Sequence, residues 1–201
     1  KTYTISSSGI INTSVISTQT FESMAAYEPK IIQTAGTVYA VVYRGSGNSG
    51  YLKTVTITSG GVTGSTGSSL IFDATTAYEP TICYVINDVY AISYRSGTNA
   101  GRLKTVSIAA NGTISGTIID TFTYAASNCI EPVLTYVATG IYAIAYRGTG
   151  NAGIIITIGI NTTAGITAAT YQIVATAGDS TIRASVNITP TVTSIISWIS
   201  Q

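Results

Sequence analysis

Short apolar runs rich in β-branched and aromatic residues alternate with glycine- and asparagine-rich stretches along the chain. This pattern favours strands over helices. The run at 89–94 is apolar on both faces, as expected of a strand packed between two neighbours. The run from about 113 to 124 is mostly polar and rich in hydroxyls, which is typical of an outer edge strand. The sequence therefore predicts an all-β protein.

These runs belong to an internal repeat. Its first mark is a Glu-Pro step, which recurs 51 and 52 residues apart at Glu28, Glu79 and Glu131. Fifteen residues after each glutamate comes a Tyr-Arg pair, followed by a loop with glycine and asparagine and, in the first two copies, by Leu-Lys-Thr. Each copy predicts four strands, which begin at the Glu-Pro step, at the run that ends in Tyr-Arg, at Leu-Lys-Thr and at the polar run.

The two chain ends supply halves of a fourth copy. Lys1 lies 52 residues before Lys53, so residues 1–5 and 10–21 predict the third and fourth strands. Arg183 lies 52 residues after Glu131, so residues 183–201 predict the first and second strands. Four periods of about 52 residues account for the length of 201.

We therefore expect one domain, 1–201, folded as a four-bladed β-propeller with four-stranded blades. The predicted blades are 27–77, 78–129, 130–182 and a split blade of 183–201 plus 1–26. Pairing of the N-terminal strands with the C-terminal strands closes the ring and removes exposed ends. A strand-swapped dimer or filament, in which one chain completes the blade of another, is the alternative.

The blade sequence also resembles a known group of proteins. Glu-Pro, then a run such as Ile141–Gly148 (consensus Val-Tyr-Ala-Ile-Ala-Tyr-Arg-Gly), then Asn-x-Gly and Leu-Lys-Thr-Val, is similar to repeats in propeller domains of archaeal and bacterial surface or secreted proteins. The resemblance covers essentially the whole chain. It implies extracellular display and interaction, and it brings no catalytic residues with it.

Composition narrows the classes of partner. The net charge is +1 and only 8% of residues are charged, which argues against nucleic acid and anionic membranes, because both need a dense basic face. No apolar run approaches the ~18 residues of a membrane span. Hydroxyl-rich surfaces are common outside the cell, and four sequons are acceptors for N-glycosylation there. Their asparagines are Asn12, Asn111, Asn161 and Asn187.

Catalytic signals are sparse. The chain has no histidine, which removes the commonest general base and most zinc sites. Its glycine loops join two strands and so lack the helix N-terminus that cradles phosphate. We expect no enzyme, cofactor or metal; a carboxylate pair for glycoside hydrolysis is a distant alternative. Cys83 and Cys129 either form one disulfide or stay as two thiols.

The repeated charges allow two interpretations. In the first, each blade holds a structural ion pair: Glu28 with Arg44, Glu79 with Arg95 and Glu131 with Arg147. The fourth copy supports this, because the two positions change together to Arg183 and Ile199. In the second, aromatic, guanidinium and amide groups on the loop side bind glycans. The candidate residues are Tyr43, Arg44, Asn48, Tyr94, Arg95, Asn99, Tyr146, Arg147 and Asn151.

The sequence thus predicts a non-catalytic extracellular module for structure or interaction. It would serve as a subunit of a surface layer, sheath or filament, or as an adhesive domain. Its partners would be further copies of itself or other surface proteins. A lectin-like propeller that binds glycans is the alternative. The repeated lysines Lys1, Lys53 and Lys104 are expected to be solvated and to discourage strand mispairing.

Overall fold

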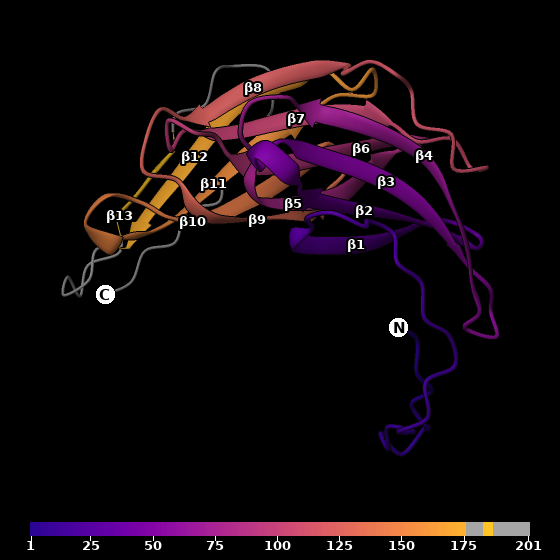
Figure 1. The fold of residues 1–201 in the computed structure, drawn as a ribbon. Coiled ribbons are helices and arrows are strands. Elements are labelled where there is room, and N and C mark those ends of the chain that lie inside the picture. Colours follow the sequence, from indigo (N-terminus) through magenta and orange to yellow (C-terminus); the bar gives the residue numbers. More distant parts are fainter. Residues whose placement is uncertain (176–182, 187–201) are drawn as a thin grey trace.

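The computed structural model describes residues 1–175 and 183–186, which form three antiparallel sheets (Figure 1). Sheet A contains β1 (Tyr27–Ala35), β2 (Val38–Arg44), β3 (Gly50–Ile57) and β4 (Thr63–Asp73). Sheet B contains β5 (Tyr78–Ile86), β6 (Val89–Arg95), β7 (Gly101–Ser107) and β8 (Asp120–Ala125). Sheet C contains β9 (Ile130–Ala138), β10 (Ile141–Arg147), β11 (Gly153–Ile160), β12 (Ile166–Ala175) and β13 (Arg183–Val186). Two short 3-10 turns, η1 (Ser46–Asn48) and η2 (Thr149–Asn151), join β2 to β3 and β10 to β11.

Each sheet is a meander, in which consecutive strands pair side by side. The all-β class, the antiparallel order and the repeat of four strands predicted from the sequence are confirmed. The outer strand β8 begins later than predicted, at Asp120. Before it, Ile114 forms only an isolated bridge to Ile108, so the chain joins the ladder over a shorter stretch.

The sheets pack face to face, with their first strands β1, β5 and β9 next to one another. The second strands of sheets A and B, β2 and β6, are buried on both faces because each has neighbours on both sides. In sheet C, β10 is exposed on its outer face at Ala145. In β2, Ala40 and Val42 enter the core shared with sheet B, whereas Val41 and Tyr43 face the N-terminal segment, residues 1–26. A second core between sheets B and C contains Leu103 and the third sheet's apolar side chains.

The N-terminal segment packs against sheet A like the outer half of a blade. Its backbone forms antiparallel bridges between Thr2 and Ser17 and between Ile5 and Ile11. Its ring Phe21 meets Tyr43 edge-on, with ring centroids 5.3 Å apart. The predicted strands 1–5 and 10–21 therefore contact each other only through isolated bridges, and neither forms a regular strand.

One hydrogen bond recurs at each contact between neighbouring sheets. A threonine of the third strand, or of the N-terminal segment, donates to a turn carbonyl of the following sheet. The bonds are Thr54 Oγ1 to Gly112 O (2.8 Å), Thr105 Oγ1 to Ala164 O (2.9 Å) and, from the N-terminal segment, Thr2 Oγ1 to Gly61 O (2.5 Å). We call these three bonds the threonine ladder. Because Thr2 takes part, the N-terminal segment is joined to sheet A in the same way as sheet A is joined to sheet B.

The described residues do not form a closed ring of four sheets. The sequence places Arg183 at the start of a separate fourth blade, but β13 pairs with β12 as a fifth strand of sheet C. The free edge of an outer strand presents unpaired N–H and C=O groups, so it readily accepts another strand. The N-terminal segment and β13 lie at opposite ends of the row of sheets (Figure 1). The predicted strands at 187–201 lie outside the described residues.

Candidate functional site

The repeated Glu-Pro step forms a corner at the start of each first strand. Glu28, Glu79 and Glu131 all have positive φ angles, of 55°, 54° and 53°. In sheet A the strand register shifts at this point, between Tyr27 and Lys30, which is the mark of a β-bulge. A proline fits directly after the glutamate because the bulge requires no ladder hydrogen bond from it.

Two of the three predicted ion pairs are present and are bidentate. Arg44 donates from Nε and Nη2 to the Glu28 carboxylate over 3.2 and 3.3 Å. Arg95 does the same to Glu79 over 3.0 and 2.9 Å. The remaining guanidinium nitrogen, Nη1, donates to a loop amide oxygen in every sheet: Arg44 to Asn48, Arg95 to Asn99 and Arg147 to Asn151.

Tyrosine rings lie against the guanidinium groups of Arg44 and Arg95. The Arg44 guanidinium carbon lies 4.3 Å from the Tyr27 ring centroid and 5.1 Å from that of Tyr78. The Arg95 carbon lies 4.4 Å from the Tyr78 centroid. Each contact is a cation–π interaction, and Tyr78 connects the sites of sheets A and B.

The third site is incomplete. Within the described part of the chain, Arg147 has no carboxylate within ion-pair distance, and it is exposed. The ring position is also lost, because Ile130 stands where sheets A and B have tyrosine. The ion pair therefore forms where a following sheet covers it, and it is absent at the exposed end.

The glutamates also connect one sheet to the next. Glu28 Oε2 accepts the backbone N–H of Glu79 over 2.8 Å, and Glu79 Oε2 accepts that of Glu131 over 2.7 Å. Burial raises the pKa of Glu79, but the hydrogen bonds from Arg95 and Glu131 outweigh it, and the net pKa lies below its usual value. The carboxylate is therefore ionised and engaged on both sides.

The predicted glycan-binding tyrosines do not lie beside these arginines. Tyr43 and Tyr94 are completely buried, and Tyr146 is half-buried. Successive strand residues point to opposite faces, so a tyrosine next to an arginine in sequence faces away from it. The hydroxyls instead donate to acids of the preceding sheet or segment, Tyr43 to Glu22 (2.8 Å) and Tyr94 to Asp73 (2.6 Å).

The same acids bind the repeated lysines. Lys53 Nζ lies 2.9 Å from Glu22, and Lys104 Nζ lies 3.5 Å from Asp73. The expectation of solvated lysines is wrong for Lys53 and Lys104: each is mostly buried between two units and also donates to a backbone carbonyl, of Phe21 or Phe72. Lys1 is exposed, as expected. The repeat indicates this pairing in the sequence, because Glu22 and Asp73 stand 51 residues apart, as Lys53 and Lys104 do.

The carboxyl groups of Glu22 and Asp73 both have pKa values below their usual range. The hydrogen bond from Lys53, with those from Met24 and Tyr43, lowers the pKa of Glu22 to about 2. Burial raises the pKa of Asp73, but hydrogen bonds from Tyr94 and Thr75 bring its net pKa down to about 2. These are ionised structural groups rather than proton donors at neutral pH.

The other predicted sites are separate from this cluster. Cys83 and Cys129 are both free thiols; the Cys129 sulfur lies 3.2 Å from the Tyr124 hydroxyl. The sequon asparagines Asn12, Asn111 and Asn161 are exposed in turns. Asn187 lies outside the described residues. Of the residues that the structure describes, no three histidines, cysteines, aspartates or glutamates form a group suited to a metal ion.

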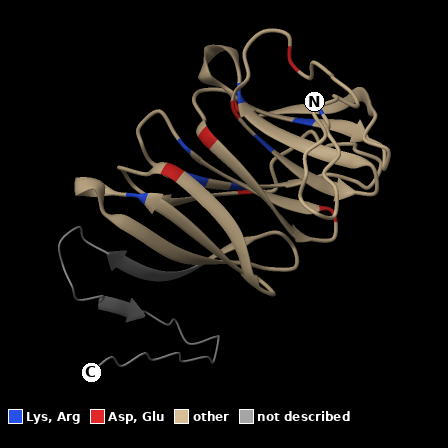
Figure 2. Ribbon diagram, turned by 90° about the horizontal axis from the view of Figure 1, so that it is seen from below, with Lys and Arg blue, Asp and Glu red and all other residues tan. Residues whose placement is uncertain are grey.

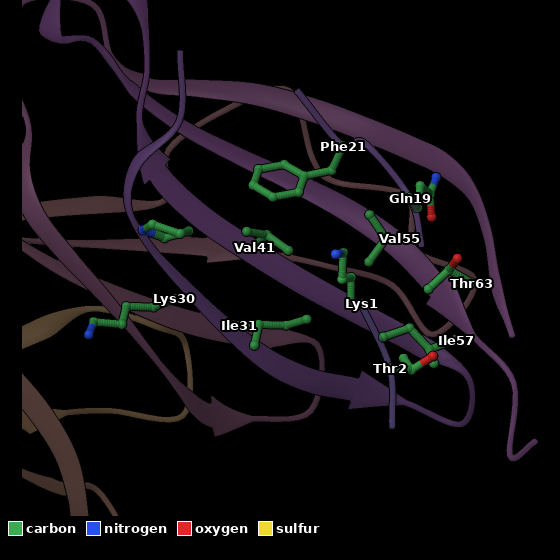
Figure 3. A pocket seen from close by; sticks show the side chains of 11 residues that line it. Lys1, Thr2, Gln19, Phe21, Lys30, Ile31, Val41, Val55, Ile57 and Thr63 are labelled. Atoms are coloured by element: carbon green, nitrogen blue, oxygen red, sulfur yellow. The ribbon is translucent and has the colours of Figure 1, made fainter. Parts of the chain in front are cut away.

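An apolar pocket of about 290 Å³ lies between the N-terminal segment and sheet A (Figure 3). Phe21, Ile31, Val41 and Val55 line it, and Lys1 and Thr2 stand at its border. No acidic residue lines it, and its polar lining residues are Lys1, Thr2, Gln19, Lys30 and Thr63. Acidic and basic positions are interspersed over the sheets (Figure 2).

The arrangement therefore joins sheets to one another, and the arginines of sheets A and B are already bound by carboxylate and amide groups of the protein. Within the described ranges, no helix is long and apolar enough to cross a membrane. Comparison with models of known protein families and with curated proteins finds no match.

Proposed function

We propose that this chain is a non-catalytic structural or interaction module of the cell exterior, which works by presenting blade faces to other protein. One observation carries the proposal: the same repeat position is buried inside the row of sheets and exposed at its end. Ile82 and Leu134 are 9% and 6% exposed, because a preceding sheet covers each. Ile31, their equivalent in sheet A, is 57% exposed.

The finer fold that we propose supplies the missing cover. The N-terminal segment provides the two outer strands of a fourth blade, and residues from 183 onward provide the two inner strands. This requires β13 to leave the edge of β12. Nineteen residues are enough for two strands and a turn, since β9 and β10 together take eighteen, from Ile130 to Arg147. The inner strands would fill the pocket beside Ile31.

The extracellular location rests on composition and on accessible sequons. Charged residues make up 8% of the chain, so much of the surface polarity comes from hydroxyl groups. The exposed turn asparagines Asn12, Asn111 and Asn161 can be reached by a glycosylating enzyme, and sugars there would add solubility. Expression in a secretory host, followed by mass spectrometry of the intact protein, tests whether these three positions carry glycans.

A glycan-binding role is the alternative. It has less support, because the Arg44 and Arg95 nitrogens that would hold a sugar already bind Glu28, Glu79 and the loop asparagines. A glycan array together with electron microscopy separates the two functions. Self-assembly without binding at millimolar sugar supports the structural role. Saturable sugar binding that is lost in Arg147→Ala, whose side chain is exposed, would overturn it.

A further inference from the structure

We infer that the outer face of sheet C, centred on Thr157, binds the N-terminal segment of a second copy of this chain, with Thr157 Oγ1 donating to the carbonyl of Gly9. The inference rests on the proposed function and names the partner of the exposed blade face. It follows from the threonine ladder, which is complete at three contacts and lacks its fourth.

Thr157 is the fourth member of the ladder by position. It stands 52 residues after Thr105 and 103 after Thr54. Its Oγ1 atom is buried and has no hydrogen-bond partner within the described part of the chain. The hydroxyls of Thr54 and Thr105, by contrast, donate to a turn of the following sheet. A buried hydroxyl without a partner is rare in proteins, so Thr157 indicates a missing acceptor.

The acceptor turn is also present four times. In each copy the residue that offers its carbonyl has a positive φ angle, and its N–H bonds to the carbonyl three residues earlier. The members are Gly9 (φ 80°, bond 2.9 Å), Gly61 (79°, 2.8 Å), Gly112 (88°, 2.8 Å) and Ala164 (67°, 3.0 Å). The last three accept from the ladder threonines. Gly9 is exposed and lacks such a donor within residues 1–175.

The apolar side chains around Thr157 point to the same conclusion. Ile155 is 44% exposed, whereas its equivalents Leu52 and Leu103 are fully buried beneath the following sheet. Val133 is 59% exposed, whereas its equivalent Thr81 is 9% exposed. The N-terminal segment in turn exposes Ile5, Ile10, Ile11 and Val15. Two apolar surfaces thus lie uncovered, one on each side of the missing contact.

A second copy fits these observations if the fourth blade proposed above is completed between chains, with residues from 183 onward of one copy beside the N-terminal segment of the next. The N-terminal segment already binds its own sheet A through Thr2 and Gly61, and it lies at the opposite end of the row from sheet C (Figure 1). Its outer side is therefore free for the sheet C of a neighbour. Such a contact is head-to-tail, and repetition of it builds a ring or a filament.

Cross-linking between two single-cysteine chains tests the contact. Both chains carry Cys83→Ala and Cys129→Ala; one adds Ser8→Cys, beside Gly9, and the other adds Thr157→Cys. A short bismaleimide should join the mixed chains into a product of twice the 20.8 kDa mass. The matched control is Thr2→Cys with Gly60→Cys in one chain, which lie at the existing contact between Thr2 and Gly61 and should cross-link without a change in mass.

Two results would overturn the inference. If Ser8→Cys and Thr157→Cys in one chain cross-link only within that chain, at every dilution, the contact closes a four-bladed ring instead, and the proposed function is untouched. If neither arrangement cross-links while the control does, sheet C binds something else. Sugar binding or catalysis found in the same preparation would instead contradict the proposed function, so the two failures are distinguishable.

Sedimentation velocity gives a second measurement that does not depend on cysteines. Thr157→Val keeps the side-chain shape and removes the hydroxyl, so it should weaken self-association roughly two- to tenfold, the value of one hydrogen bond. Thr121→Val, on exposed β8, should leave association unchanged. A wild-type chain that remains monomeric at high concentration, or equal association of both variants and wild type, would argue against the contact.

Discussion

The Glu28 carboxylate accepts the backbone N–H of Glu79 over 2.8 Å, and this bond ties the Glu-Pro corner of sheet A to that of sheet B. The relation repeats from Glu79 to Glu131. The carboxylates of Glu28 and Glu79 also bind the guanidinium groups of Arg44 and Arg95 in their own sheets. Each carboxylate therefore joins two strands within a sheet and also joins that sheet to the next. The repeated glutamate therefore joins each sheet to the one that follows it.

Glu79→Gln should destabilise the fold by about 2 kcal/mol, because Arg95 loses a bidentate carboxylate in a mostly buried position. The matched control is Glu131→Gln, at the same repeat position but exposed and without an ion pair to Arg147 in the described residues. It should change the free energy of unfolding by less than about 0.5 kcal/mol. Urea denaturation of both variants measures this. Equal effects would show that the ion pair contributes nothing.

Acid should weaken the fold through Glu22 and Asp73. Both have a folded pKa of about 2, below the ordinary values of 4.5 and 3.8. Their stabilisation is present above the ordinary values and is lost as the pH falls through about 2. Wild type should therefore lose stability between pH 5 and pH 2, and Glu22→Gln with Asp73→Asn should flatten that loss.

Urea midpoints at several pH values test this acid dependence. Asp88→Asn serves as the control, because Asp88 is exposed in the β5–β6 turn and its side chain makes no hydrogen bond in the described residues. It should retain the slope of the wild type. A double variant that keeps the full slope would assign acid sensitivity to other carboxylates.

Gly101→Ala should cost about 1 to 3 kcal/mol, as overpacking of a core does. A methyl group there would overlap the Tyr124 ring and the Cys129 sulfur, both of which are held in the core. Gly153→Ala is the matched control at the same repeat position, where a methyl group meets nothing within 4 Å. Thermal unfolding of the two variants should differ clearly. Equal losses of stability in the two variants would show that glycine is needed at this position for its backbone conformation and not for the space that its missing side chain leaves.

Thr105→Val should lower the free energy of unfolding by about 1 to 2 kcal/mol, because the Ala164 carbonyl loses its buried donor. Thr121→Val, on exposed β8, should have little effect. Hydrogen exchange would localise the change: amides of sheet C should exchange faster in Thr105→Val. If the amides of sheet C exchange at the same rate in both variants, the hydrogen bonds of the threonine ladder do not stabilise the packing of the sheets.

Much of this arrangement could be predicted from the chain. The spacing of Glu28, Glu79 and Glu131 indicated the three sheets and their boundaries, and the joint change to Arg183 and Ile199 indicated that Glu and Arg pair. The structure has two of those pairs. A repeat supports such predictions because equivalent residues in each copy make the same contacts.

Other features could not be predicted, because they depend on which side of a strand faces which neighbour. Tyr43 and Arg44 are adjacent in sequence, yet one is buried against Glu22 and the other binds Glu28. The prediction for Lys53 and Lys104 is wrong for the same reason: in a single strand these side chains would be solvated, and they pair with acids only where two units meet.

The sequence by itself determined the all-β class, the period and the order of strands, because alternation, turn residues and repeat spacing are local properties of the chain. The tertiary structure decided which repeats are complete. Ile31 and Thr157 have the same sequence surroundings as their equivalents in the other repeats. Ile31 is exposed, and Thr157 Oγ1 lacks a hydrogen-bond partner within the described residues, because no neighbouring sheet covers them there.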